Sequence, residues 1–194
     1  PGQNITGLSG LAEEVSRKWL ELLREAVPRI TRVAVLAVPQ DPAHDRMRME
    51  IERAARALKV AVQPQDVIGP DDVEHAFAGL VKGGAQGLIV LPHAVTNARR
   101  TQIAGLATKN RLAGMYPDGQ YVEAGGLISY AANFSALHRR AATYVDRILK
   151  GAKPADLPVE QPTKYELVIN LKAAKALRVT IPQSLMLRAD RVVD

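Results

Sequence analysis

Hydrophobic residues in the first two thirds of the chain follow two alternating patterns. Short apolar runs occupy residues 33–38, 87–91 and 112–116, and such runs suit strands that are buried on both faces. A further strand is predicted over 60–67, although Pro64 interrupts its pattern. Between them, apolar side chains recur at helical spacing over stretches of about a dozen residues. Strands that alternate with helices of this length indicate βαβ units with right-handed crossovers. The pattern therefore predicts an α/β fold built on a doubly wound parallel sheet.

Turn and capping residues set the expected limits of the helices. The opening helix is predicted over residues 11–26, with Trp19 on the apolar stripe that faces the core, and it ends before Pro28. Further helices are expected over 46–58, 70–82 and 98–110. The segments 39–45 and 92–97 are expected to be loops, and 117–119 a turn.

The regular alternation of strand and helix patterns ends after Tyr116. A strand is predicted over 127–131, and Asn133 is the expected N-cap of a long helix that runs to Lys150 and ends at Gly151. A further strand over 165–171 and a short helix over 172–177 follow, and the tail from Ile181 to Asp194 is expected to supply an edge strand.

Charge and composition narrow the class of partner. The chain of 194 residues has a net charge of +6, which raises nucleic acid as a partner. Its basic residues are scattered over different predicted helices, without a long Lys/Arg run or interleaved aromatics. We therefore expect solvated helix faces and no nucleic acid partner. No stretch approaches the ~20 apolar residues of a membrane span.

Motifs for catalysis, metal binding or cofactor binding are missing from the sequence. The chain has no cysteine, and its four histidines do not form a metal-binding spacing. Gly7-Leu8-Ser9-Gly10 lacks the nucleophile-elbow spacing, and the glycines of 83–87 follow a helix where a dinucleotide loop would follow a strand. An α/β hydrolase or transferase would need a nucleophile–base pair, which we do not find. We expect a binding protein with no catalytic residues, metal or cofactor.

Polar residues cluster where the predicted strands end. In a doubly wound sheet, the carboxyl ends of the strands open onto a ligand-binding crevice, and helix N-termini point into it. His44 and His93 both fall in expected loops after strands. The predicted ligand-binding residues are Gln40, His93, Thr96, Asn97 and Asp118. Helix N-termini favour a carboxylate-bearing solute such as an amino acid, and Asp118 offers a partner for its amine.

Several segments together resemble one family, the type I periplasmic solute-binding proteins of ABC transporters, in the tryptophan/tyrosine-type or unknown-substrate subgroup. The most specific is Tyr121-Val122-Glu123-Ala124-Gly125-Gly126-Leu127-Ile128-Ser129-Tyr130. The other matching segments are 1–7, 32–38, 87–92, 141–162 and 166–170. The similarity runs in order along essentially the whole chain.

The resemblance implies a two-lobed clamshell that closes on a small solute and delivers it to an ABC permease. It implies that residues 1–126 form the second lobe, that 127–163 return toward a first lobe absent from this fragment, and that 164–194 form a hinge strand and tail. It also implies a periplasmic or lipid-anchored location, with a signal peptide outside this chain. The effector domain of a LacI-type regulator shares the clamshell and is the alternative.

The predicted helix after Asn133 also suggests self-association. Its apolar residues would pack on the absent lobe, and left exposed they would form a patch of the kind that marks an association site. The seven residues are Phe134, Leu137, Ala141, Tyr144, Val145, Ile148 and Leu149. We therefore expect this fragment to form a twofold dimer, with Gly125-Gly126 as a flexible joint.

Overall fold

A computed structural model describes residues 3–10 and 12–194 of the chain. Leu11, the expected first residue of the opening helix, lies outside the described residues, as do Pro1 and Gly2. The chain separates into two compact units. The larger unit comprises residues 12–131 and 167–194, and the smaller comprises 1–11 and 132–166. The lobe boundaries predicted above stay a prediction.

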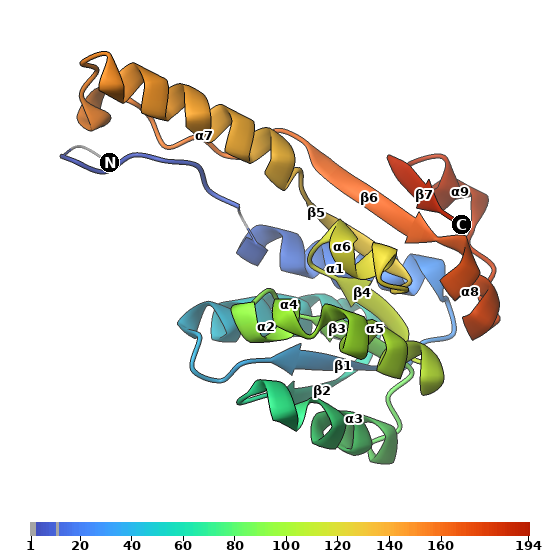
Figure 1. Ribbon diagram of the computed structural model, residues 1–194. Helices are drawn as coiled ribbons and strands as arrows, with labels where there is room; N and C mark the ends of the chain where they lie inside the picture. Colours follow the sequence, from blue (N-terminus) through green and yellow to red (C-terminus); the bar gives the residue numbers. More distant parts are fainter. Residues whose placement is uncertain (1–2, 11) are drawn as a thin grey trace. The chain divides into compact units, whose positions relative to one another are not determined.

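The elements follow the predicted alternation of strand and helix (Figure 1). The strands are β1 Arg32–Ala37, β2 Ala61–Asp66, β3 Gly87–Val90, β4 Ala113–Tyr116, β5 Ile128–Ala132, β6 Tyr165–Asn170 and β7 Arg191–Val193. The α-helices are α1 Ala12–Ala26, α2 Pro42–Leu58, α3 Val73–Lys82, α4 Ala94–Ala98, α5 Arg100–Lys109, α6 Gly119–Glu123, α7 Phe134–Leu149, α8 Leu171–Leu177 and α9 Gln183–Met186. Two 3₁₀ turns, Pro70–Asp72 and Pro154–Asp156, complete the described elements.

The strands form one mostly parallel sheet in the order β2-β1-β3-β4-β5-β6-β7. All four strands predicted over 33–38, 60–67, 87–91 and 112–116 are confirmed, and neighbouring strands pair in parallel from β2 through β5. The last two strands, β6 and β7, are parallel to each other. However, Leu127 accepts a backbone hydrogen bond from Asn170, and Asn133 donates one to Lys164. Residue numbers therefore fall along β6 as they rise along β5, so these two strands are antiparallel.

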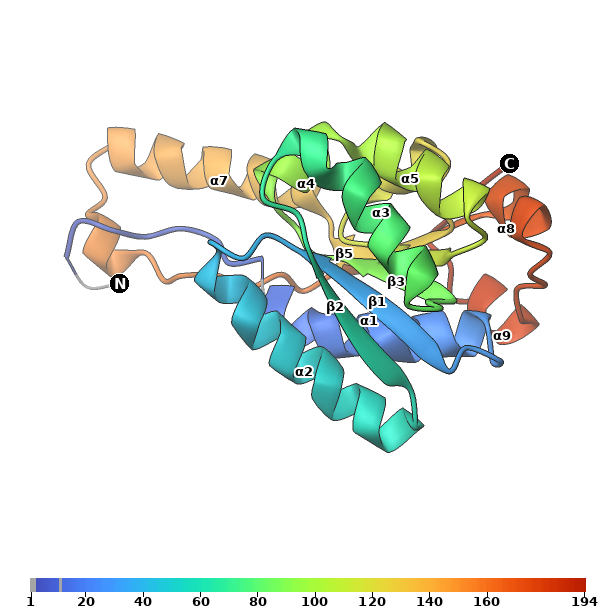
Figure 2. The same cartoon turned by 90° about the horizontal axis from the view of Figure 1, so that it is seen from below.

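Helices cover both faces of the sheet in the larger unit. Helices α1 and α2 pack together on one face, and α3 and α5 pack together on the other (Figure 2). Trp19 of α1 is only 2% exposed, which confirms its predicted place in the core. Its indole N–H donates to the backbone oxygen of Tyr130 at 2.6 Å, so its one polar group is satisfied inside the core.

Three predicted loops or turns are partly helical, because polar side chains cap the backbone there. Helix α2 begins at Pro42, four residues before the predicted start, because the Asp41 side chain accepts from the backbone N–H of Ala43. The predicted loop 92–97 contains α4, and Arg99 separates it from α5. The predicted turn at 117–119 is the start of α6, with Asp118 as its N-cap.

The predicted edge strand of the tail is only partly correct. Strand β7 lies at the end of the sheet order, but it spans just Arg191–Val193. The preceding residues include the short helix α9. The Ser184 hydroxyl and the Arg188 guanidinium, in and just after α9, donate to the carboxylate of Glu25 on α1. These tertiary contacts outweigh the alternating sequence pattern that predicted a longer edge strand.

The smaller unit is built around α7. Asn133 caps this helix by accepting from the backbone N–H of Ala136, as predicted. An extended segment around Glu160 exchanges backbone hydrogen bonds with Gly7 and Ser9. Arg140 of α7 bonds both carboxylate oxygens of Glu160, at 2.5 and 2.7 Å. The unit is therefore held together by polar contacts as well as by packing.

Candidate functional site

The carboxyl ends of β1, β3 and β4 lie side by side, because these strands are parallel neighbours. From β1 the chain passes through α2 to β2 on one side of it. It then returns through α3 to β3 on the other side of β1. The ends of β1 and β3 therefore flank the point where strand order reverses, which is where ligands bind in sheets of this kind.

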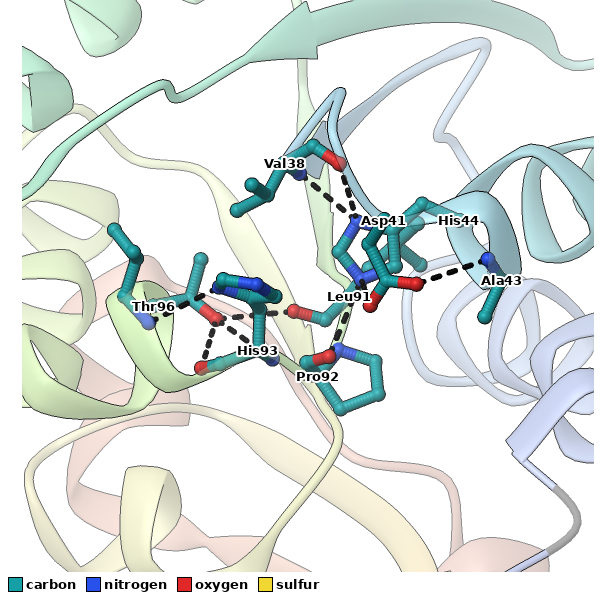
Figure 3. A network of polar contacts seen from close by, with 9 residues as sticks. Val38, Asp41, Ala43, His44, Leu91, Pro92, His93 and Thr96 are labelled. Atoms are coloured by element: carbon teal, nitrogen blue, oxygen red, sulfur yellow. Dashed lines mark hydrogen bonds and ion pairs between the residues drawn. The ribbon is translucent and has the colours of Figure 1, made fainter.

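His44 lies buried between these two strand ends (Figure 3). The prediction placed it in a loop, whereas the early start of α2 puts it on a helix and turns it inward. Its Nδ1 lies 2.9 Å from the backbone nitrogen of Val38, and its Nε2 lies 3.2 Å from the backbone oxygen of Pro92. The carboxylate of Asp41 is 3.6 Å from Nε2. One imidazole thus bridges the segments that follow β1 and β3.

His93 stands beside His44 and begins α4. The two rings meet edge to face, with centroids 5.9 Å apart. Nδ1 of His93 accepts from the backbone N–H of Val95 at 3.1 Å. The hydroxyl of Thr96 accepts from the backbone N–H of His93 and lies 3.0 Å from its carbonyl oxygen. This reciprocal capping fixes the His93 backbone, and the His93 ring is half-buried where the chain leaves β3.

Thr96 is a support for this turn. Its side chain is fully buried, and its hydroxyl also lies 3.1 Å from the backbone oxygen of Leu91. With its hydrogen-bonding capacity used inside the protein, Thr96 shapes the site from within.

Asn97 and Asp118 gather around Tyr121. The Tyr121 hydroxyl donates to Oδ1 of Asn97 at 2.9 Å. Asp118 caps α6, which carries Tyr121, by accepting from the backbone N–H of Gln120 at 2.7 Å. Burial raises the pKa of Tyr121 to about 12, so its hydroxyl stays a hydrogen-bond donor at neutral pH. This leaves the Asn97 amide N–H groups and the second Asp118 oxygen available to a solute.

Helices begin after all three strand ends, yet the chain already caps each of them. Asp41, His93 and Asp118 each accept from a first-turn N–H group, of α2, α4 and α6 respectively. Two of these caps carry negative charge, which offsets the positive end of the helix dipole. A solute carboxylate therefore finds fewer free N–H groups here than the strand pattern alone implies.

The structure brings most of the predicted residues to one edge of the sheet. Gln40, at the end of β1, is exposed there, and His93, Asn97 and Asp118 follow β3 and β4. The prediction from sequence did not include His44, Asp41 or Tyr121 in the site. The pair Asp41-Pro42 indicates the early start of α2 in the sequence, because Asp is a preferred N-cap and Pro a preferred first helical residue. Among residues 3–10 and 12–194, no cluster of side chains fits a metal ion.

Comparisons with known proteins identify the family of the chain. The model of a family described as ABC transporter substrate binding protein matches residues 1–193. The chain belongs to this family. No curated protein matches the chain. In the described part of this ABC substrate-binding chain, no helix is both long and apolar enough to span a bilayer.

Solved structures share the fold of this ABC substrate-binding chain. An ABC domain from Streptococcus pneumonia in complex with L-Trp has a TM-score of 0.87 at 23% identity, over 100% of this chain and 66% of that one. A conserved domain protein from Vibrio cholerae has a TM-score of 0.86 at 23% identity, over 97% and 63%. The open, ligand-free substrate-binding protein CD0873 from Clostridium difficile has a TM-score of 0.72 at 21% identity, over 100% and 64%. The chain thus spans less than two thirds of the length of these relatives.

Proposed function

We propose that this chain forms one wall of the solute site of an ABC import system and acts by binding, without catalytic turnover. The observation that carries the proposal is a group of polar side chains at the carboxyl edge of the sheet. His93 and Asn97 follow β3 beside the strand-order reversal, and Asp118 follows the neighbouring strand β4. Membership of the substrate-binding family supports transport over the alternative of a LacI-type effector domain. A small solute and an ABC permease are the proposed partners, with no nucleic acid.

The proposed solute is an amino acid or a similar molecule with an amine and a carboxylate. The second oxygen of Asp118 suits an ammonium group, since the first is held by Gln120. The Asn97 amide and the His93 ring offer donors to a carboxylate, with the first-turn N–H groups that the caps leave unused. The pneumococcal relative in complex with L-Trp makes this amino acid the first one to test. The proposed location is outside the cytoplasmic membrane.

Calorimetry with the full-length protein tests the solute class. L-tryptophan and a panel of other amino acids are titrated, with N-acetyl-tryptophan and tryptamine to remove the amine charge and the carboxylate in turn. We expect binding of at least one amino acid and strong weakening with both analogues. Failure of every amino acid to bind would remove this class of solute.

A conservative variant separates the charge of Asp118 from its capping role. Asp118→Asn keeps an oxygen that can accept from the Gln120 N–H, so α6 stays capped. It removes the negative charge that faces the ammonium group, and we expect an affinity loss of about tenfold or more. Glu123→Gln, at the far end of α6 where the side chain pairs with Arg191, is the matched control. Equal affinity of Asp118→Asn and wild type would exclude Asp118 from the site.

We also propose that this 194-residue chain self-associates through α7. Phe134, Val145 and Leu149 are 44%, 55% and 82% exposed on this helix, whereas Tyr144 is buried. The exposed apolar residues provide a surface that a second copy would cover.

A further inference from the structure

His44 is bonded in a way that determines which of its nitrogens carries the proton. The backbone N–H of Val38 donates to Nδ1, so Nδ1 has no proton, and Nε2–H then donates to the oxygen of Pro92. The Val38 oxygen also lies 3.1 Å from Nδ1, but it already accepts from the backbone N–H of Asp41. A proton on Nδ1 instead would leave the Val38 N–H without its partner and set the Nε2 lone pair against the Pro92 oxygen. The Nε2–H form therefore satisfies every group in this buried cluster.

The same logic applies to His93. The backbone N–H of Val95 donates to its Nδ1, so the neutral ring carries its proton on Nε2. Among the described residues, Nε2 has no hydrogen-bond partner, and the ring is half-buried at the carboxyl end of β3. The His44 and His93 rings meet edge to face (Figure 3). The backbone oxygen near Nε2 of His44 belongs to Pro92, the residue just before His93.

We propose that His44 is a positioning residue for the solute site, joining the ends of β1 and β3 so that His93 presents a neutral Nε2–H donor to an oxygen atom of the solute. This inference rests on the proposed function for its last step. It explains why a polar ring occupies a position that is only 1% exposed, where an apolar side chain would otherwise fill the space. The proposal also assigns recognition of a solute oxygen to the His93 side chain, because the helix N-termini at this edge of the sheet are already capped.

Ring nitrogen signals in ¹⁵N-histidine-labelled, solute-free protein test the positioning step directly. At a pH well above the usual histidine pKa of about 6.5, we expect both His44 and His93 to show a proton on Nε2 only. His75, which is exposed on α3, should show the averaged signal of a free ring. Mixed or Nδ1–H forms at His93 in the wild type would overturn the inference.

Two substitutions at His44 distinguish the role of its hydrogen bonds to Val38 and Pro92 from the role of simple packing. In His44→Asn an acceptor remains near the Nδ1 position, but the side chain no longer reaches Pro92. In His44→Gln the longer amide reaches the Pro92 oxygen. We expect His44→Asn to mix the tautomers of His93 and to weaken L-tryptophan binding about tenfold, the equivalent of one hydrogen bond. His44→Gln should restore both in part, and His75→Asn should change neither.

The outcomes distinguish this inference from the proposed function. If L-tryptophan and the other amino acids fail to bind the wild type, the proposed solute class falls, while the ring signals still decide whether His44 positions His93. If an amino acid binds and His44→Asn changes neither its affinity nor the His93 signals, the solute site stands and the positioning role of His44 is wrong. The positioning role is also wrong if the Asn and Gln variants lose affinity equally, because that result reflects packing alone.

Discussion

At the scale of single residues, Glu160 shows how one ion pair makes stability depend on pH. Hydrogen bonds from Arg140 lower the pKa of Glu160 from 4.5 to about 2 in the folded smaller unit. A carboxyl group with a depressed folded pKa favours the folded state above its unfolded pKa, and this contribution disappears as the pH falls through the folded value. We therefore expect the smaller unit to lose stability between about pH 5 and pH 2.

Urea unfolding followed through the ring signals of Tyr144 measures this loss, since the Tyr144 hydroxyl donates to Pro158 within the same unit. Glu160→Gln should lower stability at neutral pH and flatten the acid dependence. Asp156→Asn, at an exposed acidic residue of the same segment, is the control and should keep the wild-type profile. An unchanged profile in Glu160→Gln would show that other carboxylates cause the acid sensitivity.

At the scale of elements, Gly126 lets α6 and β5 pack closely against Tyr116. The Tyr116 ring is buried and stacks on Tyr121, with ring centroids 5.2 Å apart. A Cβ at Gly126 would lie 2.5 Å from Cε2 of Tyr116 and 2.8 Å from the backbone oxygen of Tyr121. The second of these contacts is with backbone, so a side-chain rotation cannot relieve it.

We expect Gly126→Ala to destabilise the larger unit by about 1–3 kcal/mol, the usual cost of overpacking. Gly105→Ala is the matched control, because Gly105 lies inside α5 and a Cβ there meets nothing within 4 Å. It should stabilise the unit by about 0.5–1 kcal/mol through helix propensity. Denaturant midpoints at constant slope measure both changes. Equal stability of the two variants would contradict this account of the Tyr116 packing.

At the scale of the whole molecule, the exposed face of α7 leads to a prediction about assembly. We expect the 194-residue chain to be a dimer at micromolar concentration by light scattering. Leu149→Glu and Val145→Glu together should give a monomer, because each places a charge on the apolar surface. Leu187→Glu, at an equally exposed leucine near α9, should leave the dimer intact. A wild-type monomer would remove α7 as a self-association surface.

The sequence by itself determined the elements whose signals are local. Short apolar runs specified β1, β3 and β4, because both faces of a central parallel strand are buried. The weaker pattern over 60–67, which Pro64 interrupts, corresponds to the edge strand β2. Helical spacing placed Trp19 in the core, and the Asn133 side chain caps the helix that follows it. The rule that ligands bind at strand ends was enough to select one edge of the sheet, and the structure brings Gln40, His93 and Asp118 there.

Only the tertiary structure decided how that edge is organised. His44 bridges Val38 and Pro92, which lie far apart in the sequence, and no local pattern encodes such a contact. The reversal of β6 depends on pairing with β5 after the chain has passed through α7 and the extended segment that follows it. Short polar side chains at strand ends serve equally well as helix caps and as ligand contacts, because both roles use the same lone pairs. Which role each one takes depends on the backbone N–H groups that folding brings within reach.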